Sequence, residues 1–85
     1  MQPTHIRLFI KSFCGWCDAA REWLDDHQIK YTVINVSRDP KAFQEMEELS
    51  GQTRAPVIDI DGEILADFGP EELAAFWQEL TSREK

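Results

Sequence analysis

Cysteine is scarce in this chain of 85 residues, which contains only two. Two cysteines are too few for a small secreted scaffold held together by several disulfides. They also fall short of the four ligands of a typical zinc site, because His5 and His27 lack the spacing of a zinc finger. We therefore expect no metal site in this protein.

Long apolar runs and basic clusters are also missing from the sequence. No apolar stretch approaches the roughly 20 residues of a membrane helix, and residues 1–5 show no basic region followed by an apolar run, so we expect no signal peptide. The formal net charge is −7, with 9 Lys and Arg against 16 Asp and Glu. Such a surface would repel the phosphates of a nucleic acid. The sequence predicts a cytoplasmic monomer that binds neither a membrane nor a nucleic acid.

The remaining composition predicts a single α/β domain over residues 1–85. Hydrophobic residues make up 42% of the chain, which is enough for a small core. Apolar and β-branched segments predict strands at residues 5–10, 30–36, 56–60 and 63–65, the last two joined by an Asp61-Gly62 hairpin turn. Apolar residues at helical spacing predict three helices: one after Cys14, one from Pro40 to Gly51 and one from Pro70.

The order β-α-β-α-β-β-α predicts a four-stranded mixed sheet covered by three helices. The first two strands should be parallel, because a helix connects them, and the last two should form an antiparallel hairpin. Ser37 and Asp39 are both candidates to cap the second helix. No linker, repeat or low-complexity segment divides the chain.

The strongest chemical signal is the segment Cys14-Gly15-Trp16-Cys17, which places two thiols one helical turn apart after a predicted strand. The start of a helix favours the thiolate form of cysteine. The second thiol can close a disulfide with the first. A purely structural disulfide across so short a loop would stabilise the fold only weakly. The spacing therefore indicates a thiol–disulfide exchanger.

These elements and motifs resemble the glutaredoxin family of the thioredoxin-fold superfamily, over the chain from about Thr4 to Leu80. The segment Lys11-Ser-Phe-Cys14 resembles the basic residue that the family has before its nucleophile. Arg54-Ala-Pro-Val57 resembles the family's Thr-Val-Pro segment, whose proline is cis. The resemblance implies a thioredoxin-like fold and a dithiol oxidoreductase, in which Cys14 attacks a disulfide and Cys17 resolves the mixed disulfide.

The resemblance also implies binding residues around the thiols. Lys11 would stabilise the Cys14 thiolate, and the backbone of Ala55 would pair with an incoming peptide or glutathione like an added strand. Trp16 would form an exposed apolar wall beside the sulfur. From the residues alone, Lys11 is equally well a solvated surface lysine, and Trp16 has the alternative of a core position. The predicted substrate- and glutathione-binding residues are Lys11, Trp16, Arg54, Ala55, Pro56, Asp67 and Phe68.

The run from Ala66 to Glu71 departs from the pattern of glutathione-using members, which commonly have Gly-Gly followed by Asp. Asp67 would place a negative charge near the carboxylates of glutathione. The run is similar to that of glutaredoxin-like electron donors of ribonucleotide reductase and of mycoredoxins. By itself, it also suits a helix start, with Asp67 as the cap and Pro70 in the first turn.

The reductant and one alternative function stay open at this stage. The resemblance implies no tightly bound cofactor, disulfide-containing proteins as substrates, and either glutathione or a thioredoxin-reductase-type flavoenzyme as the reductant. The alternative is a glutathione-dependent module that binds an iron–sulfur cluster between two protomers, which a flexible Gly15 would accommodate. Asp18 opposes thiolate formation if its carboxylate turns towards the sulfurs, and Arg21 is placed to neutralise it.

Overall fold

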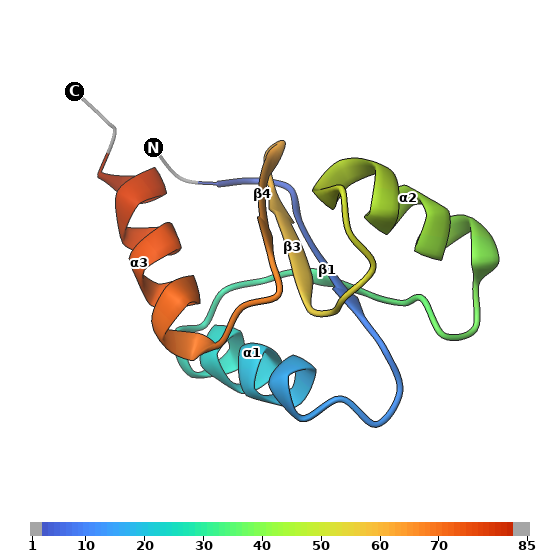
Figure 1. Cartoon of the computed structure of the whole chain (residues 1–85). Coiled ribbons are helices and arrows are strands. Elements are labelled where there is room, and N and C mark those ends of the chain that lie inside the picture. The colour runs from blue at the N-terminus through green and yellow to red at the C-terminus, as the bar shows by residue number, and fades with distance from the viewer. Residues whose placement is uncertain (1–2, 83–85) are drawn as a thin grey trace.

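The computed structural model describes residues 3–82, which form seven helices and strands in the predicted order (Figure 1). The strands form one sheet in the order β2-β1-β3-β4. The pairing is parallel between β1 and β2 and antiparallel elsewhere, so the predicted mixed sheet is confirmed. The elements are β1 (Ile6–Ile10), α1 (Gly15–Asp26), β2 (Thr32–Asn35), α2 (Pro40–Ser50), β3 (Val57–Ile60), β4 (Glu63–Ala66) and α3 (Pro70–Thr81).

Helices cover both faces of the sheet, with α1 and α3 against one face and α2 against the other (Figure 1). Successive side chains of a strand point to opposite faces. Leu8 of β1 therefore packs with α1 and α3, whereas its neighbour Phe9 packs with Met46 of α2. All three side chains are fully buried. Because β1 is covered on both sides, its sequence is almost continuously apolar.

The ends of α2 follow the chemistry of its sequence. The Asp39 carboxylate accepts hydrogen bonds from the backbone N–H groups of Lys41 and Ala42, at 3.1 and 3.3 Å. Of the two candidates, Asp39 is thus the residue that caps the helix, and Pro40 lies in the first turn as predicted. The helix ends at Gly51, whose φ of 73° lies in the left-handed region that glycine tolerates.

The β3–β4 hairpin turns at Asp61-Gly62, as predicted. Both residues have positive φ, 51° and 93°, as a two-residue hairpin turn requires. The Asp61 carboxylate also accepts hydrogen bonds from the backbone N–H groups of Thr4 and His5, which lower the pKa of this carboxyl group. The hairpin thereby fastens the segment that leads into β1.

The predicted capping of α3 by Asp67 is wrong. Gly69 is the cap residue, and its N–H donates to Oε1 of Glu72 at 2.9 Å, while Pro70 lies in the first turn as predicted. Asp67 has a φ of 54°, and its N–H donates to the carbonyl of Pro56 at 2.9 Å. This bond continues the β3–β4 pairing by one residue, so Asp67 lies at the end of the hairpin, two residues before the cap position.

A charged cluster ties α2 to the sheet. Arg7 and Asp59 are cross-strand partners in β1 and β3. The Arg7 guanidinium donates from Nη2 and Nε to Asp59 Oδ2 at 2.6 and 3.2 Å, and from Nη1 to Glu45 of α2 at 2.7 Å. Asp59 is only 8% exposed, and it also accepts a hydrogen bond from the N–H of Gly62 at 2.8 Å.

Within residues 3–82, no helix has both the length and the apolar character needed to cross a membrane.

Candidate active site at the start of α1

The two cysteines occupy different environments at the start of α1. Cys14 is the cap residue of the helix and is half-buried, whereas Cys17 is 1% exposed and lies in the core. Both thiols are free, and the N–H of Cys17 donates to the sulfur of Cys14 at 3.2 Å. A hydrogen bond to the sulfur and the start of a helix both favour negative charge on Cys14. The geometry supports Cys14 as the attacking thiolate and Cys17 as the resolving thiol.

The burial of Cys17 controls its protonation. Burial, together with the hydrogen bond to Cys14, raises the pKa of the Cys17 thiol to about 12. A backbone hydrogen bond from Lys11 acts in the opposite direction, and the charge of Asp18 raises the pKa further. Cys17 is thus protonated at neutral pH, so any attack by its sulfur would require the loss of this proton. Asp18 opposes ionisation, as the sequence suggested, and it does so at the second thiol.

The loop before Cys14 is held by small polar side chains. The N–H of Ser12 donates to the hydroxyl of Ser37 at 3.0 Å, and the Asn35 amide donates to the hydroxyl of Ser12 at 3.4 Å. The Asn35 carbonyl oxygen in turn accepts from the N–H of Ser37 at 2.9 Å. Sequence reasoning missed the role of these three residues in the site, since it considered Ser37 only as a helix cap. The signal was their position at or just after the carboxyl ends of two adjacent parallel strands, which meet at one edge of the sheet.

The side chains of Trp16, in α1, and Lys11, just after β1, lie against different parts of the fold. Trp16 is 63% exposed, which confirms the predicted exposed position. Its ring lies against Gly69, where an added Cβ would be 2.9 Å from Cζ3 of the indole. Glycine at this position thus makes room for the ring. The Lys11 ammonium lies 5.5 Å from the centre of the Phe43 ring of α2.

The segment before β3 packs against the same core cluster as the cysteines. The peptide bond between Ala55 and Pro56 is cis, as the resemblance implied, and the Pro56 ring is fully buried. Ala55 is half-buried and packs against the core cluster that contains Cys17. Phe68, a predicted binding residue, is 3% exposed and belongs to the same core. Its side chain therefore packs in the core and offers little surface to a ligand.

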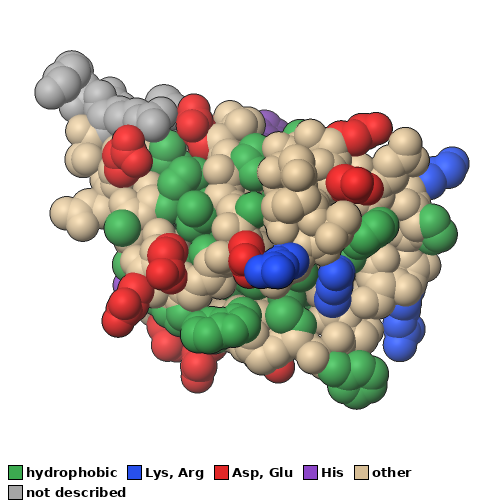
Figure 2. Space-filling model, viewed as in Figure 1, with side chains coloured by type: hydrophobic (Ala, Val, Ile, Leu, Met, Phe, Trp, Pro, Cys, Tyr) green, Lys and Arg blue, Asp and Glu red, His purple; other side chains and the backbone are tan. Residues whose placement is uncertain are grey.

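Carboxylates border the site on the side of α3. A shallow hollow beside Trp16 is lined by Asp67 and Glu72, together with Phe68 and Gly69. Asp67 forms an exposed ion pair with Arg54, with 3.4 Å between Oδ2 and Nη1. Figure 2 shows acidic side chains along the lower left of this face, where α1 and α3 lie, and the visible basic side chains farther towards α2.

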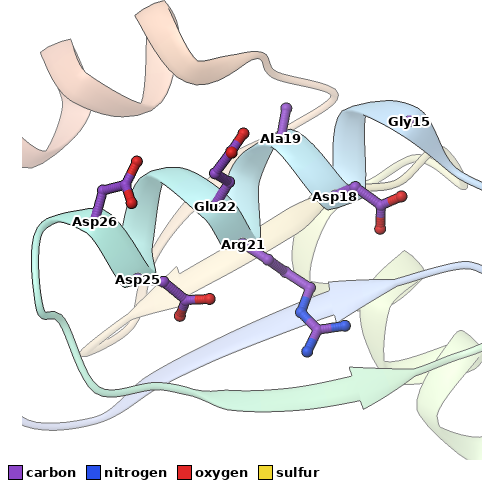
Figure 3. A pocket seen from close by; sticks show the side chains of 7 residues that line it. All are labelled: Gly15, Asp18, Ala19, Arg21, Glu22, Asp25 and Asp26. Carbon is purple, nitrogen blue, oxygen red and sulfur yellow. The ribbon is translucent and has the colours of Figure 1, made fainter.

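A second hollow lies along the outer surface of α1 and contains neither cysteine (Figure 3). Its charged residues all come from this helix, and Figure 3 shows Arg21 on the same side as Asp18 and Asp25. The Tyr31 hydroxyl, just before β2, donates to the Asp25 carboxylate at 2.9 Å. Burial and the bond to Asp25 raise the pKa of Tyr31, while Arg21 opposes this shift. The bond between Tyr31 and Asp25 thus fastens α1 to the segment before β2.

Comparison with known proteins agrees with the fold and the cysteine motif. The family model described as Glutaredoxin matches residues 6–65. The chain belongs to the glutaredoxin family. It is 37% identical over 68 residues to a glutaredoxin-like 8.6 kDa protein in the rubredoxin operon of Clostridium pasteurianum, which covers 80% of this chain and 91% of the relative.

Two further comparisons involve proteins called NrdH. The glutaredoxin-like protein NrdH of Lactococcus lactis subsp. cremoris is 32% identical over 69 residues, which is 81% of this chain and 94% of the relative. The solved structure of NrdH-redoxin from Escherichia coli has a TM-score of 0.72 and 22% identity, and covers 85% of this chain and 93% of that one. The latter likeness shows the thioredoxin-like fold.

The cysteine geometry and the family together define the chemistry of this glutaredoxin. Both cysteines of the motif are present and free, one half-buried at the surface and one in the core. The protein is therefore a dithiol thiol–disulfide oxidoreductase. Within residues 3–82, no group of three or more His, Cys, Asp and Glu side chains is arranged to hold a metal ion.

Proposed function

We propose that this glutaredoxin reduces disulfides of protein partners in the cytoplasm and receives electrons from a thioredoxin-reductase-type flavoenzyme rather than from glutathione. The observation that carries the choice of reductant is the row of carboxylates on the α3 side of the site. Asp67 and Glu72 line the hollow beside Trp16, and Glu71 lies in the first turn of α3. Glutathione carries two carboxylates of its own, which this surface repels.

Two local contacts determine how strongly the surface opposes an anionic ligand. Arg54 faces Asp67, but this ion pair is exposed and contributes little. Glu72 accepts the hydrogen bond from the Gly69 N–H, and it thereby occupies an amide that a ligand carboxylate would otherwise use. The start of α3 thus already carries several carboxylates, which disfavour the binding of a further carboxylate there. The relatives named NrdH support the same choice, since the E. coli protein is described as having a thioredoxin-like activity profile.

The reaction runs in two exchange steps. The Cys14 thiolate attacks one sulfur of the partner's disulfide, so that a mixed disulfide forms and the partner's other sulfur leaves as a thiolate. Cys17 then loses its proton and attacks the sulfur of Cys14. This step breaks the mixed disulfide and releases the reduced partner, and it leaves a disulfide between Cys14 and Cys17. Two electrons from the flavoenzyme, together with two protons, break this disulfide and restore both thiols.

Parallel assays of NADPH consumption test the proposed reductant, with insulin as the protein disulfide. One assay supplies thioredoxin reductase, and the other supplies glutathione with glutathione reductase. We expect turnover with thioredoxin reductase and little with glutathione. The Cys14→Ser variant should lose turnover in both assays, and activity retained by this variant would refute the assignment of the nucleophile. Faster turnover with glutathione than with thioredoxin reductase would refute the proposed reductant.

The charge argument has its own test. Removing the Asp67 charge in Asp67→Asn should raise turnover with glutathione about fivefold, because one exposed charge a few ångströms away contributes about 1 kcal/mol. Asparagine tolerates the left-handed backbone of this position. Glu47→Gln on the exposed surface of α2 is the matched control, and it should leave turnover unchanged. Equal glutathione turnover in Asp67→Asn and the wild-type protein would contradict the charge argument.

A further inference from the structure

Phe13, the residue before Cys14, combines two features that are unfavourable in the free protein. Its side chain is fully exposed, with a relative accessibility of 106%, the highest among the exposed large hydrophobic residues within residues 3–82. Its backbone has a φ of 57°, in the left-handed region. Bulky residues are rare in this region because Cβ crowds the following carbonyl group, whereas glycine and asparagine adopt it readily. The free fold thus gains nothing from phenylalanine at this position.

The neighbouring structure imposes this conformation. On one side, the N–H of Ser12 donates to the Ser37 hydroxyl, and the Ser12 hydroxyl accepts a hydrogen bond from Asn35. On the other side, Cys14 begins α1. Phe13 lies between these two fixed points and is directed away from the core. Residues that are held in sparsely populated backbone regions cluster at functional sites.

Phe13 and Trp16 lie on either side of Cys14 in the chain, and both are exposed. In Figure 2, hydrophobic side chains project at the lower edge of the molecule, where Figure 1 shows the β1–α1 loop and the start of α1. Trp16 rests against Gly69 and lines a hollow. The Phe13 ring stands clear of the chain on all sides, so no small ligand seated in a hollow of this protein can bury it. Only a partner with a concave apolar surface of its own can do so.

We propose that Phe13 is the anchor through which this glutaredoxin docks on its protein partners. The ring enters an apolar pocket that the partner presents beside its disulfide, and this contact brings the sulfur of Cys14 to the disulfide. Aromatic side chains that fill a pocket of the partner commonly supply most of the energy of an interface. The inference rests on the proposed function, because it assumes that the substrates are proteins.

Rates of disulfide exchange in the pre-reduced protein test this role without any reductase. The rate constant is measured with insulin and with the small, uncharged hydroxyethyl disulfide. Phe13→Asn should lower the rate constant for insulin at least tenfold and change that for hydroxyethyl disulfide less than twofold. Phe13→Tyr should retain most of the rate with insulin. Leu49→Asn, at an exposed position of α2, is the control and should match the wild-type protein with both disulfides.

Stability provides a second readout that a merely structural residue would not give. Because asparagine and glycine suit the left-handed backbone, Phe13→Asn and Phe13→Gly should both melt several degrees higher than the wild-type protein. A variant that is more stable than the wild-type protein and yet reacts more slowly with insulin has lost docking, because its fold is intact.

Three results would decide against the proposals. Wild-type rates with insulin in Phe13→Asn and Phe13→Gly would overturn the docking role. Equal losses with both disulfides would also overturn it, because Phe13 would then act on the chemistry of Cys14. A wild-type protein that reduces neither disulfide would instead refute the proposed function itself.

Discussion

The reduced wild-type protein should lose stability in alkaline solution, and the Cys17→Ala variant should not show this part of the loss. Burial is the main reason that the pKa of this thiol rises from 9.0 to about 12. Between these two values, the folded protein keeps a proton that the unfolded chain releases. The stabilisation by the protonated thiol is therefore complete below about pH 9 and is lost as the pH rises towards 12.

The size of the effect follows from the shift. One pKa unit corresponds to about 1.4 kcal/mol. By pH 10, one unit above the pKa of the unfolded thiol, the free energy of unfolding should have fallen by about 1.4 kcal/mol relative to neutral pH. The full shift corresponds to a loss of about 4 kcal/mol at still higher pH.

Urea unfolding of the fully reduced proteins at pH 7, 9 and 10 measures this loss. The informative quantity is the difference in the free energy of unfolding between the wild-type protein and Cys17→Ala. Groups that titrate in this range but do not touch Cys17, such as Tyr31, whose pKa is also raised, are common to both proteins and cancel. We expect the difference to fall by about 1.4 kcal/mol between pH 7 and pH 10. A difference that stays constant would show that Cys17 ionises like a solvated thiol, and would refute its assignment to the core.

Two further substitutions test contacts away from the sulfurs. Asp59→Ala should lower the free energy of unfolding in urea by about 3 kcal/mol, because Arg7 loses two hydrogen bonds and the N–H of Gly62 loses one; a loss below about 1 kcal/mol would contradict the role of this cluster. Gly69→Ala should displace the Trp16 ring, since the new Cβ would lie 2.9 Å from it, and should cost about 1 kcal/mol. An unshifted indole N–H resonance of Trp16 in the NMR spectrum would show that the ring does not rest on Gly69.

Local chemistry made most of the fold predictable from the sequence. Asp39 and Pro40 begin α2, and Asp61-Gly62 joins β3 to β4, because caps and tight turns depend on a few adjacent residues. The cysteine motif was equally easy to recognise in the sequence, since its two thiols lie within one helical turn. The residue that caps α3 was harder to predict from the sequence. Asp67 and Gly69 both suit a cap, and the turn after β4 selected Gly69.

The parts of the site that escaped prediction depend on contacts between distant segments. Phe68 and Phe13 are both aromatic residues in loops, yet the first is in the core and the second is fully exposed. No periodicity operates in a loop, so the backbone path decides which side chain turns inward. The hydrogen bonds that join Ser12 to Asn35 and Ser37 likewise exist only once β1 and β2 lie side by side.

The depth of Cys17 beneath Cys14 also has a consequence for damage by oxidants. A peroxide that reaches this protein meets the sulfur of Cys14 first, because Cys17 is shielded from solvent. Oxidation converts the sulfur of Cys14 to a sulfenic acid, which a nearby thiol captures as a disulfide with loss of water. Cys17 lies one helical turn away and is protected by its own burial. The motif therefore stops oxidation at a state that its reductant reverses, before the irreversible sulfinic and sulfonic acids form.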